Sequence, residues 1–441
     1  MATFLKYLVF NLAFLLISYK VTGLSSIPED IQDEVKFRVD NHFCPGIAIG
    51  VIDSSGTEFF CYGKLSYNSN KNVDKNTIFQ IGSISKIYVS LILAQMVEDK
   101  LLSLDDPINK YLPDSIHIPT LNNEIITIKH LSTHTSCLQR EIEPLDLFNY
   151  YNGIKERLYS YLSNIKDTLI VGKKFQYSNV GVDLLAQILI NKSGLSYNEL
   201  LEKYITKPFK LYDTYSFHEH RNSDNIALGH QDQDIYPSWD ISYSGCILSN
   251  ANDLALFLKS QFIESNINNA INNTHALHFK ISNDQFIGLG WLYDNKNKIY
   301  QHGGGTSGFR CLIGYSLKNK KGVVVLANSI FADCDIFGRL LDTTFHLTSY
   351  KPVHIDTPKL KKYAGYYAFE KKNFGISIFF NENKLYIEWG DKTNELFPLG
   401  NDKFFIKSED VIFSFKEKEN IFYGFEYIYP IGKRGFLTKI E

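Results

Sequence analysis

Residues 79–86 read Phe-Gln-Ile-Gly-Ser-Ile-Ser-Lys, and a mainly apolar run continues from there to Met96. The apolar side chains would surround a helix on nearly all sides, which is typical of a helix buried in a protein core. Ser83 and Lys86 are three residues apart, so a helix would direct both side chains to one face. The stretch therefore predicts a buried helix that begins at a serine–lysine pair, and we expect the fold to be arranged around it.

The Ser83–Lys86 pair is a candidate for nucleophilic catalysis. A serine hydroxyl becomes a good nucleophile when a neighbouring group takes its proton, and a lysine amine can do so where burial or a nearby cation favours its neutral form. The N-terminal end of a helix also favours developing negative charge. The motif alone is weak evidence, because residues 163–166 hold a second Ser-x-x-Lys with nothing beside it that indicates chemistry.

Length and charge limit the classes of protein to which the chain can belong. Its 441 residues suffice for two or three domains, and a net charge of −2 gives no basic surface for nucleic acid. Residues 1–23 combine Lys6, an apolar run over 7–17 and small residues up to Gly23, which is typical of a cleavable signal peptide. The run is too short to span a membrane. We therefore expect a secreted or periplasmic protein with no stable membrane span after cleavage.

Hydrophobic patterns indicate how residues 24–350 are organised. The segment 28–41 predicts a helix, and the region of about 99–240 is mostly helical in pattern, most clearly at 184–190 and 197–205. Strand patterns occur on both sides of that region, at 46–52, 57–62, 288–293, 308–315 and 322–327. We therefore predict one sheet built from both ends of this part of the chain, with the helical middle as a separate lobe.

The pattern changes after a linker near Pro352–Pro358. Short aromatic and β-branched runs separated by polar turns follow, at 375–380, 384–389, 403–406, 411–415 and 421–428. Such runs predict an all-β domain over residues 351–441.

Three further stretches carry residues suited to chemistry. Residues 130–138 read His-Leu-Ser-Thr-His-Thr-Ser-Cys-Leu, residues 177–179 read Tyr-Ser-Asn, and residues 302–305 read His-Gly-Gly-Gly. The glycines allow a substrate to lie against backbone N–H groups. His130 and His134 are four residues apart, but no acidic or third histidine partner accompanies them at zinc spacing. We interpret both as structural and predict no metal site and no cofactor.

Four stretches resemble, in order and spacing, the motifs of the class C β-lactamase-like serine hydrolases. They are residues 79–86, 128–138, 177–179 and 302–304. That family includes β-lactamases, penicillin-binding D-alanyl-D-alanine carboxypeptidases and esterases. The resemblance covers about residues 28–345 and implies an α/β (α+β) fold, in which an antiparallel sheet flanked by helices is joined to an all-helical lobe. The C-terminal antiparallel β-domain resembles, more weakly, the lipocalin-like appendage of some members.

The resemblance implies four catalytic residues. Ser83 would attack a carbonyl group and form an acyl-enzyme. Lys86 and Tyr177 would share the proton transfers, and which of them is the base stays open. His302, which stands where related enzymes more often have lysine, would hydrogen-bond the Tyr177 hydroxyl or the substrate.

The resemblance also implies how a substrate is held. Asn179 would bind the amide of the acyl group, and Gly304 and Gly305 would line the substrate. The backbone N–H groups of Ser83 and Gly305 would form the oxyanion hole. Because histidine is mostly neutral at pH 7, His302 weakens the expectation of an efficient β-lactamase and favours a peptidase or esterase.

Two cysteines depart from the family pattern. Cys137 and Cys246 stand where the family commonly has glycine, and both flank the cleft in related folds. We hypothesise that they form a disulfide. A positive φ at either position would make the replacement of glycine costly.

We therefore predict a serine hydrolase that acts on an amide or ester, and the sequence does not choose among a D-alanyl peptide, a β-lactam and a small ester. One alternative is a catalytically silent protein that binds peptidoglycan or a partner in the same cleft, against which the four intact motifs argue. Another gives the main role to the C-terminal domain, as a barrel that binds an apolar ligand in a lumen lined by Phe379, Tyr386 and Phe413.

Overall fold

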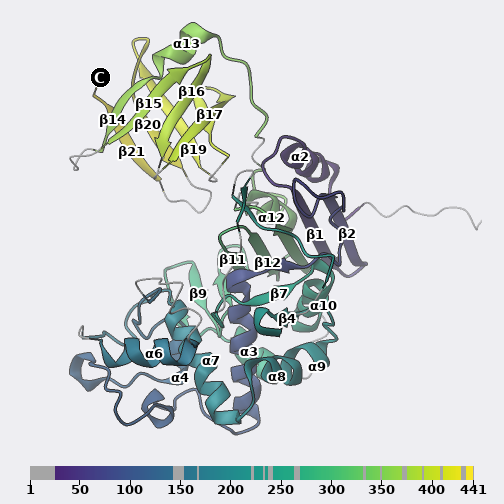
Figure 1. The fold of residues 1–441 in the computed structure, drawn as a ribbon, viewed down its shortest axis with the longest axis vertical. Coiled ribbons are helices and arrows are strands. Elements are labelled where there is room, and N and C mark those ends of the chain that lie inside the picture. Colours follow the sequence, from purple (N-terminus) through teal and green to yellow (C-terminus); the bar gives the residue numbers. More distant parts are fainter. Residues whose placement is uncertain are drawn as a thin grey trace, which may run out of the picture.

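The computed structural model describes residues 25–142, 153–165, 168–219, 223–231, 234–236, 242–262, 269–330, 334–347, 350–369, 375–389, 392–407, 411–428 and 434–440. The expected signal peptide and Lys166 of the second Ser-x-x-Lys motif lie outside them. The chain forms a body of mixed helices and antiparallel strands, and a β-barrel at one end of the molecule (Figure 1). Among the described helices, none has the length and apolar character needed to cross a membrane.

The body is built on an eight-stranded antiparallel sheet of order β2-β1-β13-β12-β11-β10-β9-β8. Its strands are β1 (Gly46–Asp53), β2 (Gly56–Gly63), β8 (Phe279–Lys280), β9 (Gln285–Ile287), β10 (Leu292–Asp294), β11 (Ile299–Gly305), β12 (Arg310–Ser316) and β13 (Lys321–Ala327). The early hairpin joins the late strands where β1 pairs with β13, with Ile47 opposite Ala327. The prediction of one sheet from both ends of this region is therefore confirmed.

Both faces of the sheet are covered, so its central strands are apolar throughout. In β13, Val323 and Val325 pack under α2 (Glu29–Asp40) and α12 (Cys334–Leu341). The alternate residues Val324 and Leu326 belong to the larger core on the other face, with α10 (Ala251–Phe262) and α3 (Ser85–Glu98). Strand alternation thus gives two hydrophobic layers, one on each side of the sheet.

One strand prediction in this sheet is wrong. Residues 288–293 do not form a continuous strand, because the chain reverses between β9 and β10. Ile287 pairs with Leu292, and the Gly288 N–H donates to the Trp291 carbonyl, 2.8 Å away. Apolar residues in this tight turn imitate a strand because they pack into the core.

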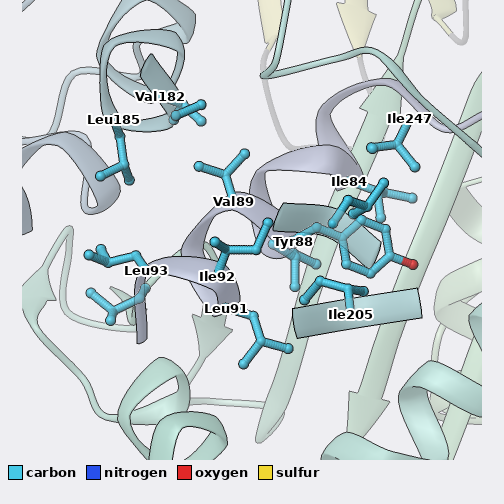
Figure 2. Packing of buried hydrophobic residues seen from close by; sticks show 14 of the residues in the cluster. Ile84, Tyr88, Val89, Leu91, Ile92, Leu93, Val182, Leu185, Ile205 and Ile247 are labelled. Atoms are coloured by element: carbon cyan, nitrogen blue, oxygen red, sulfur yellow. The ribbon is translucent and has the colours of Figure 1, made fainter. Parts of the chain in front are cut away.

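Helix α3 is the buried helix that the sequence predicts. It follows a 3₁₀ turn, η1 (Gly82–Ile84), and its side chains are buried on all sides. Figure 2 shows Val89 and Leu93 facing Val182 and Leu185, whereas Tyr88 lies on the side of Ile205 and Ile247. The helix therefore stands between the lobe and the rest of the body.

Short and medium helices make up most of the lobe. They are η2 (Ile108–Tyr111), η3 (Leu121–Asn123), α4 (Ile128–Ser132), α6 (Ile154–Ser163), α7 (Asn179–Ser193), α8 (Tyr197–Leu201), the π-turn η4 (Glu202–Thr206) and α9 (Lys207–Phe209). The predicted helix at 184–190 lies within α7, and the one at 197–205 corresponds to α8 and η4. The remaining elements of the body are η5 (Phe217–Glu219), α11 (Asn269–His275), the small sheet β3 (Phe79–Gln80), β7 (Ile247–Ser249), β4 (Tyr215–Ser216), and the pair β5 (His230–Gln231) and β6 (Asp234–Ile235).

The C-terminal region is a closed barrel, preceded by the short helix α13 (Thr357–Lys362). Its strands are β14 (Gly365–Ala368), β15 (Gly375–Asn381), β16 (Lys384–Trp389), β17 (Lys392–Gly400), β18 (Lys403–Phe405), β19 (Ile412–Lys418), β20 (Ile421–Ile428) and β21 (Arg434–Lys439). The five predicted strands are present, and sequence patterns missed β14, β17 and β21.

Side chains fill the interior of the barrel, including the rings of Tyr367, Phe404, Phe413, Phe415 and Phe425. The expected lumen lining is wrong for two of its three residues. Phe413 is inside, but Phe379 is 37% exposed and stacks on Tyr386 at the outer surface, with 5.6 Å between ring centroids. The packed interior counts against a role in binding an apolar ligand.

Candidate active site

Ser83 and Lys86 meet at the beginning of the central helix. Ser83 lies in η1 and is half-buried, whereas the Lys86 side chain, one turn later in α3, is 1% exposed. The Lys86 Nζ atom donates a hydrogen bond to Ser83 Oγ at 2.9 Å and another to the Ser244 carbonyl at 2.9 Å. Two hydrogen bonds therefore fix a buried basic group against the candidate nucleophile.

Helix α7 supports this arrangement from the lobe side. The Ser244 N–H donates to Asp183 Oδ1 at 2.8 Å, so the residue whose carbonyl accepts from Lys86 is tied to α7. Ser244 lies far from residues 79–86 in the sequence, in the stretch that ends at Cys246, and the sequence does not indicate that its carbonyl binds Lys86.

Tyr177 lies over the same lysine. The Lys86 Nζ atom is 5.1 Å from the centroid of the Tyr177 ring. The ring centroids of Tyr177 and His302 are 6.4 Å apart. The structure thus brings Ser83, Lys86, Tyr177 and His302 together, although they come from η1, α3, the loop before α7 and β11.

His134 also contacts Tyr177. The two ring centroids are 4.4 Å apart, and His134 Nδ1 accepts a hydrogen bond from the Ser178 N–H at 3.2 Å. Burial, together with the positive charge of Lys86, holds the pKa of His134 well below its usual value. A neutral His134 therefore positions the tyrosine loop, a contact that the four-residue spacing to His130 does not reveal.

His130 lies away from Tyr177 in the hydrogen-bond network and instead caps α4. Its Nδ1 atom accepts from the Thr127 N–H at 3.1 Å, at the beginning of α4. Among the described residues, no group of three or more His, Cys, Asp or Glu side chains is arranged to hold a metal ion.

His302 is buried in β11 and 4% exposed. Burial, and secondarily the charge of Lys86, lower the pKa of His302 from 6.5 to about 4, so the ring is neutral at pH 7. Its Nδ1 atom lies 2.8 Å from the Gly303 carbonyl. Because a carbonyl can only accept, Nδ1 carries the proton and Nε2 is left as an acceptor.

The edge of β11 runs directly against η1. A methyl group added at Gly304 would lie 1.9 Å from the Ile81 carbonyl oxygen, and one added at Gly82 would lie 3.0 Å from the Gly305 nitrogen. Only chain segments in direct backbone contact have such spacing. The backbone N–H groups of Ser83 and Gly305 therefore belong to adjoining segments.

Asn179 is the first residue of α7, whose N-cap Ser178 accepts from the Gly181 N–H at 2.8 Å. Asn179 Nδ2 donates to Glu141 Oε1, and within the described residues its buried Oδ1 atom has no hydrogen-bond partner. The guanidinium carbon of Arg140 lies 5.1 Å from the centroid of the Tyr177 ring. Sequence patterns did not identify Arg140 or Glu141, because both lie in a loop without a recognisable motif.

The hypothesis of a Cys137–Cys246 disulfide is wrong. Cys137 is a free thiol whose Sγ atom donates to the Ile170 carbonyl at 2.9 Å, so it is directed to that strand-like segment and not to Cys246. Its φ of +61° lies in the left-handed region, which explains why glycine suits this position better.

The sheet with helices on both faces, the helical lobe and the buried helix are the fold of penicillin-binding proteins and β-lactamases. A solved structure of the octameric penicillin-binding protein homologue from Pyrococcus abyssi superimposes with a TM-score of 0.65 at 24% identity, over 93% of this chain and 99% of that one. A family model described as Beta-lactamase matches residues 31–333, and the chain therefore belongs to the Beta-lactamase family.

The chain is also similar to individual proteins of this family, in part of its length. The D-alanyl-D-alanine-carboxypeptidase/endopeptidase AmpH of Escherichia coli (strain K12) is 34% identical over 194 residues, which are 42% of this chain. The match spans about half of that protein, 50% of its length. A β-lactamase of Yersinia enterocolitica is 23% identical over 329 residues, covering 64% of this chain and 82% of that protein.

Proposed function

We propose that the protein is a secreted serine hydrolase that cleaves an amide or ester through an acyl-enzyme on Ser83. The observation that carries the proposal is the 2.9 Å hydrogen bond from the buried Lys86 Nζ to Ser83 Oγ, beside the Tyr177 ring. A nucleophile within hydrogen-bond reach of a base, with the base itself oriented by a third group, is the general arrangement of an activated serine. Here the Ser244 carbonyl is the orienting group.

In the proposed reaction, the Ser83 hydroxyl attacks the substrate carbonyl carbon and its proton passes to the Lys86–Tyr177 pair. The carbonyl oxygen becomes negative and is stabilised by the N–H groups of Ser83 and Gly305, each of which typically contributes about 3 kcal/mol to transition-state stabilisation. The same pair protonates the leaving group, and the ester on Ser83 forms. Water then hydrolyses that ester by the reverse sequence of proton transfers.

Two groups would orient the substrate. The Asn179 Oδ1 atom has an unused acceptor in a buried position, which suits the N–H of an acyl side-chain amide. The acceptor nitrogen of the neutral His302 ring suits a hydroxyl donor, either Tyr177 or a substrate group.

Active-site labelling tests the proposal. After incubation with a fluorophosphonate or a fluorescent penicillin, we expect mass spectrometry to find one adduct, on Ser83. Ser83→Ala should abolish it, whereas Ser163→Ala is the matched control, because Ser163 begins the second Ser-x-x-Lys motif and its Oγ atom donates to the Tyr159 carbonyl. Absence of any adduct would reject the hydrolase and favour a protein that only binds ligands in this cleft.

The two reagents also separate substrate classes. Labelling by the fluorophosphonate alone would favour an esterase, and labelling by both would favour a D-alanyl peptidase or a β-lactamase. Loss of acylation in Lys86→Ala with retention in Tyr177→Phe would assign the first proton transfer to lysine. The opposite pattern would assign it to tyrosine.

Export is part of the same proposal. It is supported by the apolar run and small residues within residues 1–23. N-terminal sequencing of the protein recovered from the culture medium or periplasm should find a start near residue 24, and recovery only of the uncleaved chain inside the cell would contradict export.

A further inference from the structure

Asn179 and Glu141 meet beside the proposed catalytic residues. Ser178 has an extended backbone, with φ −138° and ψ 115°, so the side chains of Tyr177 and Asn179 leave the chain on the same side. Because Tyr177 lies over Lys86, Asn179 is directed toward the same group of side chains. The Asn179 Nδ2 atom donates a hydrogen bond to Glu141 Oε1.

The loop that carries Glu141 is held against the beginning of α7. Ser178 Oγ donates to the Gln139 carbonyl at 2.6 Å, and the Asn179 N–H donates to the Arg140 carbonyl at 3.0 Å. These hydrogen bonds join successive residues of two segments. Glu141 is the next residue of the loop, so its position beside the Asn179 side chain is fixed by the backbone.

Glu141 determines which end of the Asn179 amide faces the substrate. An ionised carboxylate can only accept hydrogen bonds, so the Asn179 NH₂ group must face Glu141 and Oδ1 must face away from it. Within the described residues, this buried Oδ1 atom has no hydrogen-bond partner. A neutral neighbour that can both donate and accept, such as glutamine, would allow the Asn179 amide to turn over, whereas glutamate does not.

Asn328 shows how a buried asparagine is satisfied elsewhere in this chain. Its Oδ1 atom accepts from the Gly46 N–H at 2.8 Å, and its Nδ2 atom donates to the carbonyls of Lys64 at 3.2 Å and Leu65 at 3.0 Å. A buried acceptor left without a donor is costly. The Asn179 Oδ1 atom therefore suits a hydrogen-bond donor from a bound substrate.

We infer that Glu141 is a positioning residue that makes Asn179 an acceptor only, and thereby selects the acyl group of the substrate. Acyl groups with an N–H beside the scissile carbonyl group, as in an N-acylated amino acid, are accepted. The matching acyl group with an ester oxygen in that place is rejected, because two acceptors would face each other without a proton between them. The inference rests on the proposed function of Ser83 and is independent of the leaving group.

The test compares two thioesters with the same thiol leaving group, one of N-acetylglycine and one of O-acetylglycolic acid. They differ only in an N–H against an oxygen, and each kcat/KM is divided by the rate of hydrolysis by hydroxide to remove intrinsic reactivity. In the wild type we expect the corrected kcat/KM to be about 10- to 100-fold higher for the N–H thioester. Where hydrolysis of the acyl-enzyme is slow, the rate of Ser83 acylation, measured by mass spectrometry, gives the same ratio.

Glu141→Gln should weaken this preference in a specific way. Because the Asn179 amide can then turn its NH₂ group toward the substrate, kcat/KM for the oxygen thioester should rise about 3- to 10-fold, and the preference should fall correspondingly. Damage to the fold would lower both values and raise neither. The double variant Glu141→Gln with Asn179→Asp exchanges the two groups and again leaves only an acceptor facing the substrate, so it should restore a preference of about 10-fold or more.

Glu202→Gln is the matched control, because Glu202 lies in η4 with its side chain 53% exposed and paired with Lys207. It should leave both values unchanged. A wild type without the preference, or an unchanged preference in Glu141→Gln, would overturn the inference and leave Ser83 as nucleophile.

The fluorophosphonate has no acyl N–H, so its reaction with Ser83 reports the proposed function separately. Labelling of Ser83 without reaction of either thioester would also overturn the inference. Absence of labelling would reject the proposed function itself.

Discussion

Single residues determine how closely β11 approaches the nucleophile. At Gly304, a methyl group would lie 1.9 Å from the Ile81 carbonyl oxygen, so Gly304→Ala forces β11 and η1 apart. A displacement of about 1 Å at a catalytic centre can cost 10²-fold in rate, and we predict about a 100-fold lower kcat/KM together with a lower melting temperature. Both can be measured by steady-state kinetics and thermal unfolding monitored by circular dichroism.

The neighbouring glycine provides the control for folding. A methyl group at Gly303 would meet Leu312 Cδ2 at 3.3 Å, and that atom is the end of a flexible side chain. Gly303→Ala should therefore melt close to the wild-type temperature. If Gly303→Ala and Gly304→Ala lower the melting temperature equally, the backbone contact is not what requires glycine at 304.

Protonation of His302 should set the pH at which activity is lost in acid. Because the pKa of His302 is lowered to about 4, the acid limb of kcat/KM should be centred near pH 4, not near the ordinary histidine value of 6.5. Below that pH the imidazolium would face Lys86, and its Nε2 atom would become a donor. A pH–rate profile checks this, with circular dichroism at each pH to separate inactivation from unfolding. A limb near pH 6.5 in folded protein would contradict it.

The same pKa affects stability with a definite sign. Between pH 6.5 and about 4 the unfolded chain binds a proton at His302 that the folded chain does not, so the free energy of unfolding falls as the pH is lowered through this window. The contribution reaches at most about 3 kcal/mol at its acid end. Urea titrations of the wild type and His302→Asn at pH 7 and pH 5 should show a weaker pH dependence in the variant.

Among the elements of the fold, α3 fixes the position of η1 and its Ser83, because α3 is packed on all sides. Ile92 is fully buried in this helix, so Ile92→Ala should lower the free energy of unfolding by about 2–5 kcal/mol through lost burial and a cavity. Ile125, which is 61% exposed, is the matched control, and Ile125→Ala should cost less than about 0.5 kcal/mol. Comparable losses in the two variants would mean that α3 can rearrange to fill the space.

Helices and strands whose apolar residues are continuous or regularly spaced could be predicted from the sequence, whereas elements without such a pattern could not. Helices α2 and α3 and the β1–β2 hairpin follow directly from their apolar spacing. Strand β17 has no clear strand pattern, because its first four residues are polar and its second half contains Pro398, next to a register shift. Local patterns cannot reveal such a strand, since it is stabilised by its neighbours in the barrel.

Strand patterns also leave open which face is the interior. In the barrel, Ile378 and Ile387 point inward, whereas the adjacent Phe379 and Tyr386 lie outside. Large aromatic residues occur in the outward-facing set as well, so choosing the aromatic residues selects the wrong face, although Lys384 and Glu388 mark that face as exposed. In the site, likewise, motif resemblance identifies Ser83, but the hydrogen bond between Lys86 and the Ser244 carbonyl joins segments 158 residues apart in the chain.

At the scale of the whole molecule, an aromatic cluster joins the barrel to the body. Phe43 and Tyr350 contribute from the body and Phe405 from β18, with 5.5 Å between the ring centroids of Phe43 and Phe405. Lys407 Nζ donates to the Asn41 carbonyl at 2.8 Å at the edge of this cluster. In β18, Phe404 fills the barrel and Phe405 points the opposite way, so strand alternation itself provides the docking residue.

This geometry predicts that Phe405→Ala releases the barrel from the body while both stay folded. Phe405 is fully buried between the body and outward-facing barrel residues such as Phe397, and it is not part of the barrel interior. Its truncation therefore removes a contact between the two parts and leaves the interior rings of the barrel in place. Small-angle X-ray scattering should show a larger maximum dimension, and a protease should cleave faster within residues 351–356, which have no helix or strand. Phe379→Ala, on the outer wall of the barrel, should match the wild type in both measurements. If Phe405→Ala instead melts the barrel at unchanged dimensions, Phe405 stabilises the barrel itself and the attachment depends on other contacts, with Lys407 the next to test.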